Sequence, residues 1–149
     1  MDIKKQDSTE PNREIIAGVL EGQGSRWGDL KSGGFDPDAL WRRVDENDEL
    51  LLDLINVFET EFPEMMRQLE ATIRRGDAVG VERSSHKIKG SLLQFSAHAA
   101  AAAALRLEQL GRSGAVAGAE VFFQGLTQET DLLLKSLHTM ARRVRGDQR

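Results

Sequence analysis

The chain has 149 residues, a net charge of −4 at pH 7 and 40% hydrophobic residues, which is enough for one domain with a packed core. It has no cysteine, which excludes disulfides and thiolate metal sites and fits a reducing compartment. No run approaches the roughly 20 apolar residues of a membrane span, and the polar N-terminus is unlike a secretion signal, so we expect a cytoplasmic protein with no membrane partner. The acidic balance argues against a nucleic-acid partner. We expect the C-terminal arginines, Arg142, Arg143, Arg145 and Arg149, to favour a helix end instead.

Three segments divide the chain. Residues 1–34 are an expected N-terminal extension, polar, rich in glycine and partly disordered, with one short helical stretch over residues 13–20. Trp27 is its one aromatic side chain, which either docks on the rest of the protein or serves a partner. Residues 35–145 are the expected folded domain, and residues 146–149 are a C-terminal tail.

The first half of the expected domain has helical spacing. Asp36 followed by Pro37 is typical of a helix start and predicts a short first helix. Asn47 or Asp48 is expected to cap a second helix, which Pro63 breaks or bends, and a third helix then runs to Gly76. Apolar residues recur every three to four positions along these helices: Leu40, Val44, Leu51, Leu54, Ile55, Phe58, Phe62, Met65, Met66, Leu69 and Ile73.

The second half continues the pattern. Asp77 can cap a helix that carries His86, and a turn at residues 96–98 leads into an antiparallel helix through the alanines at 99–104. The last helix is expected over residues 116–144, with glycines 111, 114 and 118 loosening its start. Its apolar residues are Phe122, Leu126, Leu133, Leu137 and Met140. Since no stretch alternates with strand period, we predict an all-α fold, a helical bundle with short loops.

His86 falls on the polar face of its helix. At about 100° per residue, the apolar stripe of that helix lies opposite His86. The stripe consists of Val81, Ile88, Leu92, Phe95 and Ala99. The residues expected around the imidazole, as candidate partner contacts, are Val79, Glu82, Arg83, Lys87, Gly90, Leu93 and Ala97. We therefore expect His86 to be exposed to a partner.

The neighbours of His86 suit a phosphoryl group better than a metal ion. Glu82 lies four residues before His86, but two ligands do not close a metal site. Lys89 lies one turn after His86 and can pair with phosphate oxygens, and Gly90 leaves room for another protein to approach. Phosphoryl transfer needs mainly positioning and charge neutralisation, which these residues can supply.

The run His86-Lys87-Ile88-Lys89-Gly90-Ser91 resembles the signature of histidine-containing phosphotransfer (HPt) domains. The similarity extends over about residues 35–145. It implies an antiparallel four-helix bundle with a short N-terminal capping helix. In that bundle His86 is the phosphoacceptor, Lys89 its electrostatic partner and Gly90 the point of access. The partners implied are response-regulator receiver domains and a hybrid histidine kinase, for a monomeric carrier with no enzymatic turnover. The protein would need no cofactor of its own, because the receiver would bring Mg²⁺.

Glu108 is a candidate orienting residue for the imidazole. His86 lies 11 residues before Ala97 and Glu108 lies 11 after it, so an antiparallel hairpin centred there puts the two at one level. Glu108 or Gln109 could then hydrogen-bond the ring nitrogen that is not phosphorylated.

Two other hypotheses about the function are consistent with the sequence. A non-transferring adaptor would bind a receiver or kinase and block or scaffold it, and Leu93 on the acceptor face supports it. In a plain helical interaction module, His86 would be an incidental surface histidine.

Overall fold

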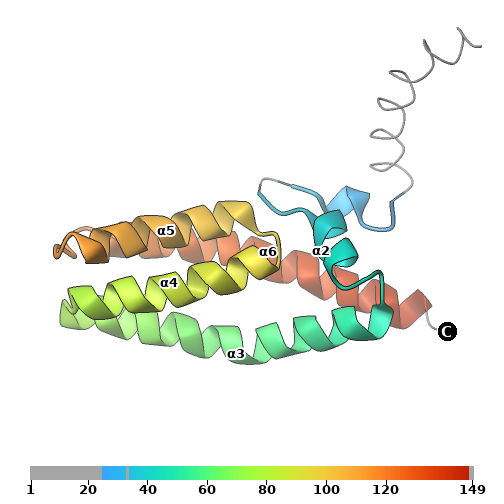
Figure 1. Ribbon diagram of the computed structural model, residues 1–149, viewed down its shortest axis with the longest axis horizontal. Coiled ribbons are helices and arrows are strands. Elements are labelled where there is room, and N and C mark those ends of the chain that lie inside the picture. The colour runs from blue at the N-terminus through green and yellow to red at the C-terminus, as the bar shows by residue number, and fades with distance from the viewer. Residues whose placement is uncertain (1–24, 33, 148–149) are drawn as a thin grey trace, which may run out of the picture.

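The computed structural model describes residues 25–32 and 34–147. The expected helix at 13–20 and the last two residues of the expected tail lie outside this part of the chain. A short 3₁₀ turn and five α-helices follow one another: η1 (Gly28–Leu30), α2 (Pro37–Arg43), α3 (Asp48–Arg75), α4 (Ala78–Gln94), α5 (His98–Arg112) and α6 (Ala119–Asp147). Figure 1 shows the four long helices alongside one another, with α2 across one end. The predicted all-α bundle with a short capping helix is confirmed.

The short helix α2 begins as predicted. Asp36 Oδ1 accepts a hydrogen bond from Ala39 N at 3.1 Å, and Pro37 occupies the first helical position. Leu40 and Val44 are buried, which fixes α2 on the end of the bundle.

Helix α3 runs through Pro63 without a break, so the prediction of two separate helices is wrong. Phe58, Phe62 and Leu69 are all buried, which means that the apolar stripe keeps its phase across the proline. Pro63 itself is exposed, so the Glu59 carbonyl that loses its N–H partner can turn to solvent. Packing of the stripe on both sides outweighs the single missing hydrogen bond.

The hairpin of α4 and α5 has defined ends. Gly76 adopts φ 69°, which favours glycine, and the Asp77 side chain then accepts from Gly80 N at 2.9 Å to start α4. The predicted turn at 96–98 is present, with Ser96 at φ 56°. Phe95 packs on Phe58 with ring centroids 4.4 Å apart, which joins the end of α4 to α3.

Gly111 lies inside α5, so the expectation that it loosens the start of the last helix is wrong. A Cβ at this position would stand 2.6 Å from Glu82 N and 2.7 Å from Ala78 O. Only glycine lets α5 approach the backbone of α4 so closely. Gly114 and Gly118 have φ of 84° and 86° and do belong to the turn before α6.

Helix α6 begins three residues later than the expected boundary, at Ala119. Leu126, Leu133, Leu137 and Met140 are buried as predicted. Phe122 was expected in the core but is 37% exposed, while its neighbour Phe123 packs against the core. One residue is about 100° around a helix, so the stripe passes through Phe123 and excludes Phe122.

Trp27 docks on the bundle, which answers the question that its sequence left open. Its side chain is fully buried and its ring meets Trp41 of α2 edge-on, with centroids 5.6 Å apart. Arg143 of α6 donates to Arg26 O at 2.7 Å and pairs with Asp29. Residues 25–32, here called the N-terminal strap, therefore join α2 to the end of α6. None of the described helices has the length and apolar character to cross a membrane.

Candidate functional site

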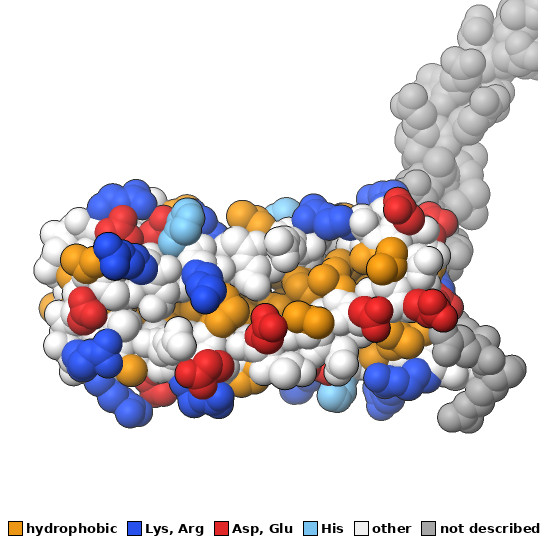
Figure 2. All heavy atoms as spheres, turned by 60° about the horizontal axis from the view of Figure 1, so that its bottom comes forward, with side chains coloured by type: hydrophobic (Ala, Val, Ile, Leu, Met, Phe, Trp, Pro, Cys, Tyr) orange, Lys and Arg blue, Asp and Glu red, His pale blue; other side chains and the backbone are white. Residues whose placement is uncertain are grey.

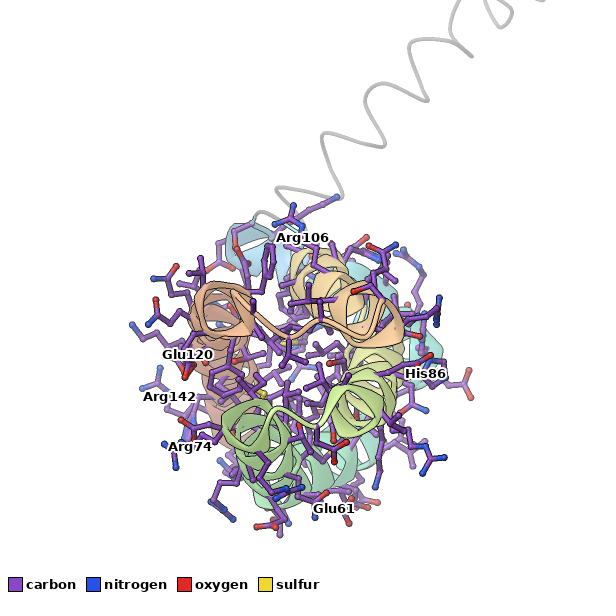
Figure 3. The ribbon with its side chains drawn as sticks, turned by 90° about the vertical axis from the view of Figure 1, so that its left-hand side faces the viewer. Glu61, Arg74, His86, Arg106, Glu120 and Arg142 are labelled. Carbon is purple, nitrogen blue, oxygen red and sulfur yellow. The ribbon has the colours of Figure 1, made fainter. Side chains whose placement is uncertain are left out.

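His86 projects from the outer face of α4, and its side chain is 69% exposed. Val81, Ser85, Ile88 and Leu92 are the buried residues of this helix, so the core side is opposite the imidazole. In the end-on view of Figure 3, His86 points away from the bundle axis. The predicted exposure of His86 is thus present in the structure.

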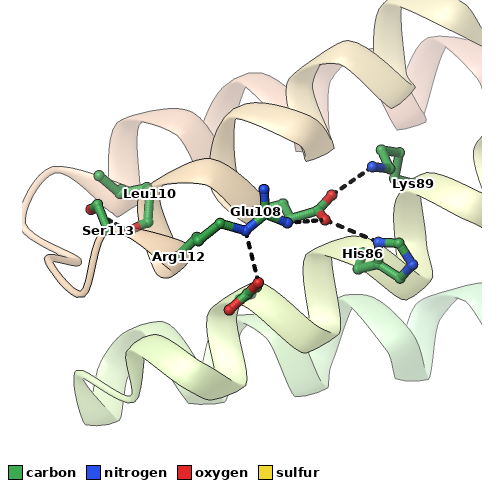
Figure 4. A network of polar contacts seen from close by, with 7 residues as sticks. His86, Lys89, Glu108, Leu110, Arg112 and Ser113 are labelled. Carbon is green, nitrogen blue, oxygen red and sulfur yellow. Dashed lines mark hydrogen bonds and ion pairs between the residues drawn. The ribbon is translucent and has the colours of Figure 1, made fainter.

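Glu108 of α5 approaches the imidazole from the neighbouring helix. Its Oε2 lies 3.0 Å from His86 Nδ1, and its Oε1 lies 2.7 Å from Lys89 Nζ (Figure 4). The glutamate is only 2% exposed, whereas His86 is open to solvent. The predicted contact between Glu108 and His86 is present, and Gln109 is on the exposed side of α5.

The contact defines which imidazole nitrogen is available. An ionised carboxylate can only accept hydrogen bonds, so Nδ1 carries the proton that Glu108 accepts. In the neutral ring the lone pair is then on Nε2. No residue of the described chain hydrogen-bonds Nε2, and the arrangement presents a nucleophilic nitrogen to whatever approaches α4.

Arg112 completes the network and was not identified from the sequence. Its Nη2 donates to Glu108 Oε2 at 2.9 Å, and its Nε donates to Glu82 Oε2 at 3.0 Å (Figure 4). The signal was the four-residue spacing of Glu108 and Arg112, which places both on one face of a helix. The close approach of α5 to α4 at Gly111 brings Arg112 within reach of Glu82.

The charges of this network favour an ionised Glu108. Burial raises the pKa of Glu108. Hydrogen bonds from Lys89 and His86, together with their charges, lower this pKa by more than burial raises it, so it is below the ordinary value. The hydrogen bond and the charge of Glu82 raise the pKa of Arg112. A buried carboxylate with cationic neighbours can stabilise positive charge that develops on the imidazole.

Most of the expected partner contacts are on the surface around His86. Val79 and Leu93 are 56% and 42% exposed, and a Cβ added at Gly90 would meet nothing within 4 Å. Arg83 and Lys87 are exposed, and Glu82 is half-buried beside Arg112. Ala97 is only 2% exposed, so its assignment as a partner contact is wrong. Helix α4 ends at Gln94, and the helical angle that placed Ala97 beside His86 does not extend into the turn.

The other histidines lie outside the site. His98 is the first residue of α5, and His138 of α6 lies 3.3 Å from Glu59 of α3. Among the residues that the structure describes, no group of three or more histidine or acidic side chains is arranged to hold a metal ion.

The comparisons with known proteins agree with this geometry. The Hpt domain family matches residues 53–143, within the domain expected from the sequence. No curated protein and no solved structure matches the chain significantly. The match covers more than half of the chain, from the first turns of α3 to the last turns of α6. With its helical bundle and an exposed histidine, the chain belongs to the Hpt domain family, the phosphocarriers of phosphorelays.

Proposed function

We propose that His86 accepts a phosphoryl group from the aspartyl phosphate of a receiver domain and passes it to a second receiver. The observation that carries this proposal is the 3.0 Å contact between Glu108 Oε2 and His86 Nδ1, which leaves Nε2 as the exposed nucleophile. Receivers and a hybrid histidine kinase are the partners proposed, in the cytoplasm, for a monomeric protein.

In the proposed transfer, Nε2 attacks the phosphorus atom of the aspartyl phosphate. The Nε2–P bond forms as the P–O bond to the aspartate breaks, and the electron pair leaves with the aspartate carboxylate. The imidazole becomes positively charged while Nδ1 keeps its proton, and Glu108 stabilises that charge across the hydrogen bond. The reverse of these steps, on another receiver, returns the ring to its neutral state.

Lys89 and Gly90 would assist on the phosphoryl side. The Lys89 ammonium is beside the ring, on Glu108 Oε1, and can move to a phosphoryl oxygen once negative charge arrives. Gly90 adds no side chain on the same face, which leaves space for a receiver to approach. We propose that the chain itself holds no cofactor and that Mg²⁺ belongs to the receiver.

The test is transfer of label from a receiver domain carrying radioactive aspartyl phosphate. The full chain should gain label that acid removes and base does not, as expected for phosphohistidine. His86→Gln should abolish the label, whereas His98→Gln and His138→Gln, which change the other two histidines, should retain it. Label that persists in the His86 variant would refute the proposal.

A non-transferring adaptor is the second candidate, and one observation favours it. Leu93 is 42% exposed on the face of α4 that carries His86, so a partner could bind there without any transfer. A wild-type chain that binds receivers but never takes label would support this alternative.

A further inference from the structure

The two sides of His86 differ in charge balance. Toward α5, Lys89 and Arg112 are both paired with carboxylates, Lys89 with Glu108 and Arg112 with Glu108 and Glu82. Two cations face two anions there, and this side offers little net charge to a partner.

Toward α3, two cations are unbalanced. Arg83 and Lys87 are exposed and four residues apart on α4, and neither forms an ion pair with any residue that the structure describes. Like charges at this spacing repel, so the folded protein gains nothing from the pair by itself. Glu64, which precedes Met65 on α3, is already paired with Arg67 at 2.8 Å.

A hollow of about 200 Å³ lies between α3 and α4 at these cations. Its walls are Met65, Gln68, Arg83, Ser84 and Lys87. Four of these side chains can donate hydrogen bonds and none is acidic, so the hollow suits a carboxylate that enters from outside. Figure 2 shows Lys and Arg side chains near one end of this face, with some acidic side chains among them, and hydrophobic side chains along its middle.

We infer that Arg83 and Lys87 select receiver domains whose surface beside the phosphorylated aspartate is acidic. In the complex, this acidic edge of the receiver lies over α3. This inference rests on the proposed function and adds the orientation and the charge of the partner. An acidic edge would remove the repulsion between the two cations and place a carboxylate in the hollow. Charges at the rim of an interface act mainly on the association rate and on its salt dependence.

The experiment compares charge reversals on opposite sides of the bundle. The α4 variant carries both Arg83→Glu and Lys87→Glu. The α6 control carries both Lys135→Glu and Arg142→Glu and changes the net charge by the same amount. Figure 3 shows His86 and Arg142 on opposite sides of the axis. With a receiver that has acidic residues at its rim, the α4 variant should bind and react about 10-fold more slowly at 50 mM salt, while the α6 control stays within about 2-fold. At 500 mM salt the difference should largely vanish.

The decisive experiment reverses the charges on the receiver. A receiver variant with lysines in place of its acidic rim residues should react faster with the α4 variant than with the wild-type chain. Equal rates for both receivers, or equal slowing by the α6 control, would overturn the inference. Labelling of His86 by phosphoramidate, a small donor that needs no docking, should slow much less in the α4 variant than transfer from the receiver does, and an equal loss in both reactions would overturn the inference. A wild-type chain that binds receivers with this charge dependence but takes no label from them would refute the relay and leave the docking surface supported.

Discussion

His86 and Glu108 lie at one level of the α4–α5 hairpin, 11 residues on either side of Ala97, and their side chains meet at 3.0 Å. The glutamate is buried and the histidine is exposed, so the contact joins the interior of the bundle to the surface that carries His86. The orientation of the ring is therefore set by a residue that is itself shielded from the surface.

Glu108→Gln should slow phosphoryl transfer about 10-fold, because a neutral amide still accepts from Nδ1 but stabilises the charged ring less. Glu108→Ala should slow it further and lower the free energy of unfolding by about 1 to 3 kcal/mol, since Lys89 and Arg112 lose their shared partner. Single-turnover transfer and urea unfolding measure the two effects. Gln109→Ala, on the exposed side of α5, is the control, and equal rates in all variants would contradict the role of Glu108.

The same carboxylate predicts a pH dependence of stability. The pKa of Glu108 is lower in the folded protein than its ordinary value of 4.5, so the native state favours the ionised form. Its contribution to stability is complete above about pH 4.5 and is lost as pH falls through the lower folded pKa. Urea unfolding between pH 3 and pH 7 should show this loss, and Glu108→Gln should flatten the curve over that range. An unchanged curve in the variant would show that other carboxylates cause the loss.

Lys89→Ala should reduce the rate of transfer within the complex more than the affinity for the receiver. In the proposed transfer the ammonium would act on charge that arrives with the phosphoryl group, so its loss should affect the transition state more than docking. Saturating and subsaturating single-turnover rates separate the two effects. Lys135→Ala on α6 is the control, and a Lys89 variant with weakened binding but full maximal rate would make Lys89 a docking residue.

Leu93→Ala should weaken receiver binding about 10-fold with little loss of stability, because the side chain is 42% exposed before binding and would be covered afterwards. Leu132→Ala, which removes a leucine that is 59% exposed on α6, should leave binding unchanged. Titration calorimetry against a receiver measures both variants. Faster transfer in the Leu93 variant would instead indicate that this leucine hinders docking.

Trp27→Ala should lower the free energy of unfolding by about 3 to 5 kcal/mol, the usual cost of removing a fully buried tryptophan. Transfer to His86 should persist at temperatures where the variant is folded, since the N-terminal strap and the imidazole are on different parts of the bundle. Thermal unfolding and labelling of the same sample test both statements. A variant as stable as the wild type would show that the strap contributes nothing to the fold.

The sequence was sufficient to predict a helical bundle from its periodicity, the cap residues from their side-chain types and the level of Glu108 from its distance to the turn. It failed where one local signal competed with longer-range packing. Pro63 is a helix breaker in isolation, yet the apolar stripe continues through it. Only the packed structure shows that burial of this stripe outweighs the effect of the proline. Ala97 was misplaced because a helical wheel carries no information about where the helix stops.

The contacts between distant segments could not be read from periodicity. Arg112 could have been found from its spacing to Glu108, but its bond to Glu82 depends on how closely α5 approaches α4 at Gly111. Trp27 lies in a polar, glycine-rich stretch with no repeating pattern, so nothing in the spacing indicated that it would be buried against Trp41.

The position of Trp27 and Trp41 also determines the optical properties of the protein. The chain has two tryptophans and no tyrosine, and both indoles are where the N-terminal strap meets α2. Near-ultraviolet absorption and fluorescence therefore come almost entirely from one end of the bundle. Tryptophan emission will follow detachment of the strap, while circular dichroism at 222 nm follows the four long helices. If the two signals melt at the same temperature, the strap and the bundle unfold as a single cooperative unit.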